Sequence, residues 1–287
     1  ETWAACPVKW LVERHLDPGA LEPDAEPLAR GALVHEVLEA TLVRLREATG
    51  SARVTVATLP EARRLAAEEL QARCGAFPLS GHEPTARASL RRLLREIERY
   101  LAFEAEAGGS WEPLHLEWRF GFEDEADGPP PLRLGDGAVT VRGVIDRIDV
   151  DASGTRAVVR DYKTGAVHPV AAWERDVRLQ IALYLLAVRR LLGLEVVAGV
   201  YQPLRRADLR GRGIVLEGPG EEALGPGGFV PTDVQGAEDF EERLAWAEEH
   251  AVALAGELRA GALVPHPERC SSRGGCSYPG ICRSVDS

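Results

Sequence analysis

The chain has 287 residues, of which 45% are hydrophobic and 28% are charged, and its formal net charge is −11. This composition is typical of a folded globular protein with an ample core and excludes a disordered chain. No apolar run approaches the roughly 20 residues that a membrane-spanning helix needs. The negative charge argues against binding nucleic acid over the whole surface, although basic stretches at 87–99 and 205–213 leave room for a local path.

Helical periodicity dominates the first third of the chain. Apolar residues recur at helical spacing over 30–48, and 60–75 and 87–107 have the same period. We therefore expect a helical insertion at about 48–112 within a single domain that spans 1–287.

The period then changes to that of β-strands. Alternation over 115–122 predicts one strand. The runs 139–150 and 155–164 predict a hairpin, because Asp151–Gly154 between them has the chemistry of a turn.

A helix at 177–193, a strand at 194–204 and a helix at 236–260 are expected next, with a loop-rich stretch at 214–235 before the last helix. The tail at 265–287 is irregular and carries a cluster of cysteines. This order of elements predicts an α/β fold in which a mixed central sheet is flanked by helices.

Lys163 is one of only two lysines among 34 basic residues, the other being Lys9. It follows Asp161 by two positions in a predicted strand, so both side chains lie on one face. Asp146 in the other strand of the hairpin lies on an otherwise apolar face, where a carboxylate is costly unless it is paired or bound to a cation. Pairing of the strands can bring the two carboxylates together beside the ammonium, which would form a site for a hard divalent cation. An Asp–Lys ion pair at a sheet edge is the alternative.

Three more residues are candidates for the same site. His35 lies in the first apolar helix beside Val34 and Leu38, where a histidine is more often a satisfied core residue than a ligand. Gln180 and Tyr184 are four residues apart and share a helix face. Taken alone, that pair indicates only the boundary of an amphipathic helix.

In chain order, four motifs resemble the RecB-like branch of the PD-(D/E)XK nuclease superfamily: GALVHEVLE, GVIDRID, DYKTG and QIALY. The likeness runs from about Arg30 to Tyr184, and VAGVYQPL is similar to the strand that follows in that family. The order and spacing of the motifs are more specific than any one of them. The resemblance implies a restriction-endonuclease-like fold and metal-dependent hydrolysis of DNA.

The resemblance also implies a ligand set for the metal. His35, Asp146 and Asp161 would hold Mg²⁺ or Mn²⁺, with the backbone carbonyl of Tyr162 as a further ligand. Hydrolysis of a phosphodiester needs a deprotonated water and a cation at the negatively charged phosphorus centre, and a metal ion supplies both.

The remaining matched residues would assist the reaction. Lys163 would position the attacking water and offset charge on the phosphate, and Gln180 and Tyr184 would brace the site and contact the DNA backbone. A lysine suits this role because its compact ammonium has rotatable donors and a pKa that shifts near a metal, which arginine lacks.

The cysteines are unevenly distributed. Cys74 lies in a predicted helix, where we expect it in the core. An odd count of five without a secretory signal fits a reducing compartment, so we expect a cytoplasmic protein. The sequence contains no methionine, which leads us to expect a piece of a longer chain.

Some RecB-like nucleases resemble the remaining pattern, with one cysteine before the nuclease core and three after it. They include AddB-type subunits of helicase–nucleases and iron–sulfur nucleases of CRISPR adaptation. The resemblance implies a [4Fe–4S] cluster on Cys6, Cys270, Cys276 and Cys282. The family usually has C-x-x-C-x5-C, whereas this chain has a longer first gap. Structural Zn²⁺ on the same thiolates is the main alternative, and a disulfide or free cysteines are a third.

The expected function is therefore that of a metal-dependent DNA exonuclease. The resemblance implies the nuclease module of a helicase–nuclease in double-strand-break repair, which receives single-stranded DNA from a partner or fused helicase, away from membranes. The alternatives are a free-standing nuclease of the CRISPR-adaptation type, a non-catalytic DNA-binding scaffold and a zinc-stapled interaction domain.

Overall fold

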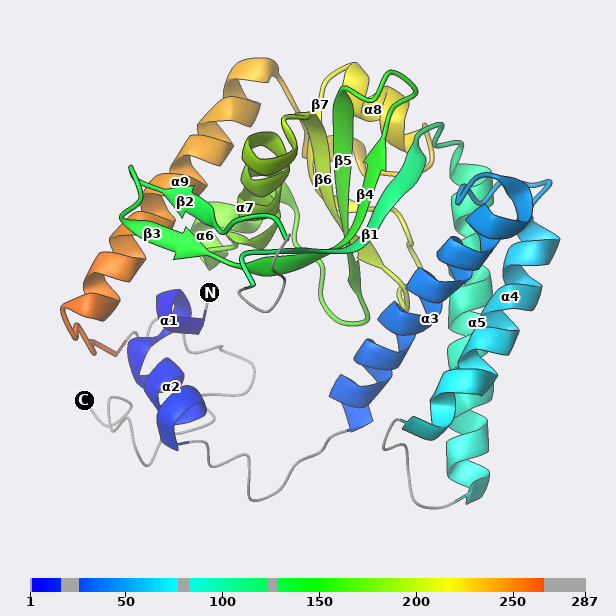
Figure 1. Cartoon of the computed structure of the whole chain (residues 1–287). Helices are drawn as coiled ribbons and strands as arrows, with labels where there is room; N and C mark the ends of the chain where they lie inside the picture. Colours follow the sequence, from blue (N-terminus) through cyan, green and yellow to red (C-terminus); the bar gives the residue numbers. More distant parts are fainter. Residues whose placement is uncertain (1, 17–25, 77–82, 123–127, 266–287) are drawn as a thin grey trace.

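The computed structural model describes residues 2–16, 26–76, 83–122 and 128–265. A six-stranded mixed sheet forms its centre, with the strand order β1-β4-β5-β6-β7-β8 (Figure 1). The pairs β5–β6 and β7–β8 are parallel and the other neighbours are antiparallel. The strands of this sheet are β1 (Glu112–Phe120), β4 (Gly143–Val150), β5 (Arg156–Lys163), β6 (Glu195–Pro203), β7 (Arg212–Leu216) and β8 (Val234–Gln235).

Helices flank the sheet on two sides, with α3, α4 and α5 on one side and α7 and α9 on the other (Figure 1). The expected α/β fold with a mixed, helix-flanked sheet is thereby confirmed. No helix in the described part is long and apolar enough to cross a membrane. The α-helices are α1 (Thr2–Ala5), α2 (Pro7–Leu11), α3 (Glu26–Thr49), α4 (Leu59–Arg73), α5 (Glu83–Ala107), α6 (Trp173–Asp176), α7 (Gln180–Ala187), α8 (Pro219–Leu224) and α9 (Ala237–Arg259).

Helices α4 and α5 lie between α3 and β1 in the sequence, in the region where a helical insertion was expected. Leu33 and Leu42 of α3 pack with Leu65 of α4 and Leu101 of α5 in one buried cluster. That cluster also includes Tyr162 of β5, so the helical layer packs directly on the strand that carries the predicted site.

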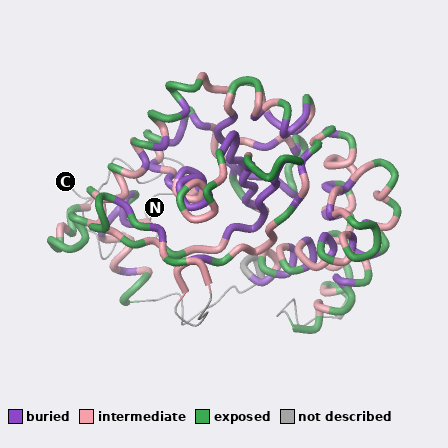
Figure 2. The backbone as a smooth tube through the Cα atoms, turned by 45° about the horizontal axis from the view of Figure 1, so that its top comes forward, coloured by how far each residue is buried: buried purple, intermediate pink, exposed green. Residues whose placement is uncertain are grey.

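The opposite layer places α7 close against β6. A Cβ on Gly199 of β6 would lie 2.5 Å from the Ile181 side chain, so only glycine permits this close approach. The helix begins at Gln180, because Val177 before it is left-handed, with φ of 48°. A π-helical segment, Val188–Leu192, follows it and ends at Gly193, whose φ of 70° is left-handed. The chain therefore leaves the helix at the glycine where its end was predicted. In Figure 2 the buried residues concentrate toward the middle of the molecule and the exposed ones toward its periphery.

Two sequence predictions about strands and loops were wrong. The predicted strand 139–150 breaks at Arg142, because its first part, β3 (Val139–Val141), pairs instead with β2 (Leu132–Leu134) in a separate hairpin. The stretch 214–235 is not only loop: it contains the end of β7, α8 and β8. These elements are too short to show a period, and β7 is stabilised by pairing with β6 rather than by its own pattern.

Candidate metal centre and active site

The predicted site lies where β4 and β5 separate. Their antiparallel ladder ends at Arg147 and Arg160. Beyond that pair, the main-chain N–H of Tyr162 donates a hydrogen bond of 2.6 Å to Oδ2 of Asp146. A side chain thus takes the donor that a continued ladder would pair with a main-chain carbonyl. This hydrogen bond holds the buried Asp146 carboxylate at the separation point.

His35 of α3 faces this carboxylate with one ring nitrogen. Its Nε2–H donates to the Tyr162 carbonyl at 3.1 Å, which leaves Nδ1 directed at Asp146 Oδ1, 3.4 Å away, and at Glu117 Oε1, 3.9 Å away. Burial alone favours the neutral ring, but the Asp146 carboxylate outweighs it and raises the pKa of His35. A nitrogen lone pair that faces two carboxylates needs a proton or a metal ion between them.

Glu117 is a residue of this site that the sequence analysis missed. It lies on β1 opposite Asp146, between the pairs Leu116–Arg147 and Trp118–Ile145. Its φ of 45° is left-handed, a costly conformation for a residue with a side chain. Burial and the nearby Asp146 carboxylate raise the pKa of Glu117 to about 7.

One ligand atom each from His35, Glu117 and Asp146 lie within 4.8 Å of one another. One imidazole nitrogen and two carboxylates suit Mg²⁺ or Mn²⁺ chemically. The His35 lone pair faces two carboxylates, which also fits a cation. Without a cation, only a proton can relieve the repulsion between the lone pair and the carboxylate oxygens. These residues therefore fit a divalent metal ion.

Lys163, Asp161 and Gln180 form a second group beside the metal-ligand cluster. Lys163 Nζ lies 2.5 Å from Asp161 Oδ2 and donates to Gln180 Oε1 at 3.2 Å. The Gln180 amide donates to Asp161 Oδ1 at 2.8 Å and to the Tyr184 hydroxyl at 3.2 Å. The predicted sharing of a face by Asp161 and Lys163, and by Gln180 and Tyr184, is confirmed.

Asp161 belongs to this second group rather than to the cluster of His35, Glu117 and Asp146. It is 2% exposed. Burial and the Asp146 carboxylate raise the pKa of Asp161 to about 7 in spite of the Lys163 ammonium. The carboxylates of the site therefore carry more negative charge than the Lys163 ammonium balances. The role of Asp161 as a metal ligand stays a prediction.

Residues 1–283 match the family model of the PD-(D/E)XK nuclease superfamily. The chain belongs to this superfamily. No curated protein sequence matches it. Within the nuclease, all the residues that the motifs singled out for the active site, from α3, β4, β5 and α7, lie in the two adjoining groups described above. Its mixed sheet is consistent with the restriction-endonuclease-like fold.

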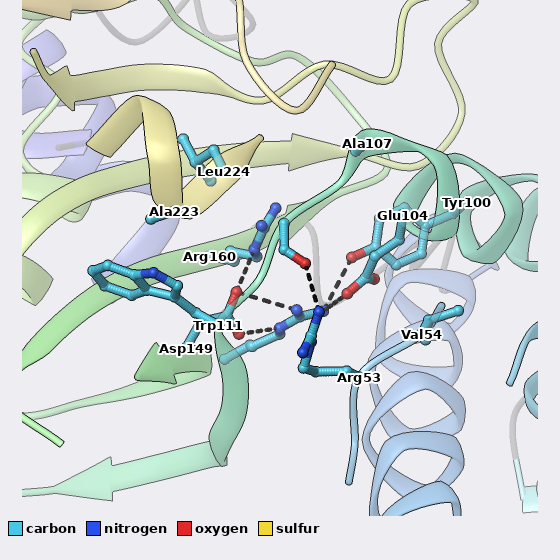
Figure 3. A pocket seen from close by; sticks show the side chains of 12 residues that line it. Arg53, Val54, Tyr100, Glu104, Ala107, Trp111, Asp149, Arg160, Ala223 and Leu224 are labelled. Atoms are coloured by element: carbon cyan, nitrogen blue, oxygen red, sulfur yellow. Dashed lines mark hydrogen bonds and ion pairs between the residues drawn. The ribbon is translucent and has the colours of Figure 1, made fainter. Parts of the chain in front are cut away.

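A separate network of buried charges joins α5 to the sheet (Figure 3). The Arg147 guanidinium lies 2.5 Å from the carboxylate of Asp149 on β4 and 2.5 Å from that of Glu104 on α5. The Arg160 guanidinium lies 2.8 Å from the same Asp149 carboxylate. Burial acts to raise the pKa of Asp149, but the two arginines hold it below its ordinary value. The cavity among these side chains measures only about 20 Å³ and has room for roughly one water. The network is thus a buried support of the nuclease and not a substrate pocket.

The predicted iron–sulfur site lies largely outside the described residues, which include neither Cys270 nor Cys276 nor Cys282. Cys6 is described and is a buried free thiol. The prediction that Cys74 lies in the core was wrong: it begins the short 3-10 turn after α4 and is only partly buried, with its Sγ–H donating to the Gln71 carbonyl.

Proposed function

We propose that this nuclease hydrolyses phosphodiester bonds of DNA in a metal-dependent reaction and acts as an exonuclease. The observation that carries the proposal is the His35 Nδ1 atom, which faces the carboxylates of Asp146 and Glu117 at 3.4 and 3.9 Å. A partly buried cluster of this kind is unfavourable in a purely structural role, and a bound Mg²⁺ or Mn²⁺ would relieve it.

The proposed metal ligands are His35, Asp146, Asp161 and the Tyr162 carbonyl, with Glu117 as an addition from the structure. When bound, the ion supplies a water of lowered pKa and a Lewis acid for the phosphate. The Nε2–H bond of His35 to the Tyr162 carbonyl orients the ring, so that Nδ1 would be the nitrogen that binds the ion.

Lys163 is the proposed group that positions the attacking water and offsets charge on the phosphate. Its ammonium is held by Asp161 and Gln180, and its side chain is 30% exposed, so that one face is open to substrate. Gln180 bonds at once to Asp161, Lys163 and Tyr184, which fixes the orientation of all three. Burial raises the pKa of Tyr184 to about 12, so its hydroxyl stays protonated and can donate to the DNA backbone.

End-labelled single- and double-stranded DNA, incubated with Mg²⁺ or Mn²⁺, tests the proposal. The wild-type protein is expected to release short labelled products that disappear with EDTA and in Asp161→Ala. Asp239→Ala is the matched control, because Asp239 is an exposed acid on α9. Binding of DNA without cleavage, unaffected by EDTA, would instead indicate a non-catalytic scaffold.

We further propose a broader setting on the basis of the motif resemblance. The chain would be the AddB-type module of a cytoplasmic helicase–nuclease in DNA repair, and would degrade single-stranded DNA that a helicase delivers. Cys6, Cys270, Cys276 and Cys282 would hold a [4Fe–4S] cluster. Iron and sulfide analysis of anaerobically purified protein, with Cys6→Ser as the variant, distinguishes a cluster from zinc, which would give a colourless protein.

A further inference from the structure

The loop that joins β6 to β7, residues 205–211, begins beside the proposed catalytic lysine. Strands β5 and β6 are parallel neighbours, so both end at the same edge of the sheet. Their pairing continues one step beyond β6, where Leu204 N–H donates to the Lys163 carbonyl at 3.0 Å. The first residue of the loop is therefore adjacent in sequence to a residue bonded to Lys163.

Side chains from two elements hold this β6–β7 loop in place. The Arg99 guanidinium of α5 donates to the carbonyls of Leu204 and Arg206 at 3.3 and 2.7 Å. From the sheet, the buried Gln202 amide donates to the Leu209 carbonyl at 2.6 Å. The loop is therefore fixed from both sides, which lowers the entropic cost of binding a ligand.

A pocket of about 320 Å³ opens between this loop and the segment that follows β5. Its lining comes almost entirely from the β6–β7 loop and the start of β7, and arginine is the commonest residue in it. The residues that line it are Val167, Arg206, Ala207, Asp208, Arg210 and Arg212.

The charges of the pocket favour an anion. Arg210 lies 2.7 Å from Asp208, and Arg212 lies 2.7 Å from Asp233. The Arg206 side chain is exposed, and among the described residues its guanidinium makes no hydrogen bond or ion pair. One arginine is thus unpaired and a second is paired only to an exposed acid, in a chain whose net charge is −11.

We infer that this pocket binds phosphate groups of the nucleic-acid strand on one side of the phosphate that is cleaved. The inference rests on the proposed nuclease function and names the surface that would hold its substrate. Guanidinium groups bind phosphate oxygens through short, charge-assisted hydrogen bonds. Because the chain as a whole is acidic, a local group of arginines on the loop that begins beside Lys163 would direct the strand into the site.

Binding measured in EDTA separates this inference from catalysis. Fluorescence anisotropy gives the Kd of a labelled 20-nucleotide oligothymidylate at several KCl concentrations. Each phosphate contact adds about 0.7 to the slope of log Kd against log salt for a single strand. We expect weaker binding and a slope lower by about 0.7 for Arg206→Ala, and lower by about 1.4 for Arg206→Ala/Arg210→Ala.

Two further variants complete the test. Arg63→Ala removes an exposed arginine of α4 and should leave both Kd and slope unchanged. Asp208→Asn frees Arg210 from its acid and should tighten binding, a gain that a folding defect cannot produce. Slopes for the Arg206 variants equal to that of the wild type, or no tightening in Asp208→Asn, would overturn the inference.

The same oligonucleotide with Mg²⁺ tests the nuclease function in parallel. If the wild type binds with the predicted loop dependence but never cleaves, the nuclease function fails and the phosphate pocket stands. If it cleaves with no dependence of binding on the loop, the pocket fails and the nuclease function stands.

Discussion

The main-chain N–H of Tyr162 donates to the Asp146 carboxylate at 2.6 Å, at the point where β4 and β5 cease to pair. This single bond places a proposed metal ligand and also satisfies a buried main-chain donor. Structural and chemical roles of Asp146 can therefore be separated by substitution.

Asp146→Asn keeps the acceptor oxygen and removes the charge. We expect it to fold with nearly unchanged stability and to lose metal-dependent cleavage. Asp146→Ala also leaves the Tyr162 N–H unsatisfied, which should cost about 1–3 kcal/mol more in the free energy of unfolding. Urea denaturation of the metal-free proteins gives the comparison. Equal destabilisation by both substitutions would show that this hydrogen bond does not hold the strands.

Glu117→Gln should stabilise the metal-free protein while it weakens metal binding. The folded-state pKa of Glu117 is about 7, above the ordinary value near 4.3, so ionisation opposes folding. Stability is therefore lost as pH rises through this window, and the penalty is complete above pH 7. Melting midpoints in EDTA should show a larger gain for Glu117→Gln at pH 8 than at pH 5. A loss of stability at pH 8 would contradict the repulsion described here.

Lys163→Arg should lower kcat on DNA by about 100-fold or more, comparable to the loss of one charge-stabilising donor. The ammonium contacts Asp161 and Gln180 at 2.5 and 3.2 Å, and the larger planar guanidinium cannot occupy that position. Lys9→Arg, at the other lysine of the chain, is the control. Unchanged turnover in Lys163→Arg would show that any cation serves at this position.

Asp149→Ala should destabilise the protein by about 3–5 kcal/mol, because it leaves two buried arginines without their shared carboxylate. The lowered pKa of Asp149 makes the same contribution depend on pH. It is complete above the ordinary value near 3.9 and is lost as pH falls below it. The free energies of unfolding of the wild type and the variant, measured by guanidinium chloride denaturation, should therefore converge at acid pH. A constant difference down to pH 2 would argue against the ion pairs.

Much of the site could be predicted because its central part is local in sequence. Asp146, Asp161 and Lys163 lie on two strands joined by a short turn. Alternation places Asp161 and Lys163 on one face, and the pairing of the strands brings Asp146 near them. The contact of Gln180 with Tyr184 follows from helical spacing in the same way. Assigning His35 to the site needed the order of several motifs, because no local pattern distinguishes it from a core histidine.

The sequence did not predict three features of the structure: Glu117 in the site, β7 and the position of the β6–β7 loop. Glu117 reaches the cluster because β1 pairs with β4 across more than twenty residues and because its backbone is left-handed. The segment HLEWRF shows only the alternation of a strand, which indicates neither its pairing with β4 nor the left-handed backbone of Glu117. β7 forms through pairing with β6. The β6–β7 loop is held by hydrogen bonds from Arg99, which lies about a hundred residues earlier in the sequence.

The central claim is that His35, Glu117 and Asp146 form a metal centre, and pulsed electron paramagnetic resonance of bound Mn²⁺ tests it most directly. We expect one bound ion with nitrogen coupling from the imidazole. In His35→Gln this coupling should disappear while carboxylate-bound Mn²⁺ persists at reduced affinity. Mn²⁺ that binds without nitrogen coupling, or that binds His35→Gln as tightly as the wild type, would contradict it.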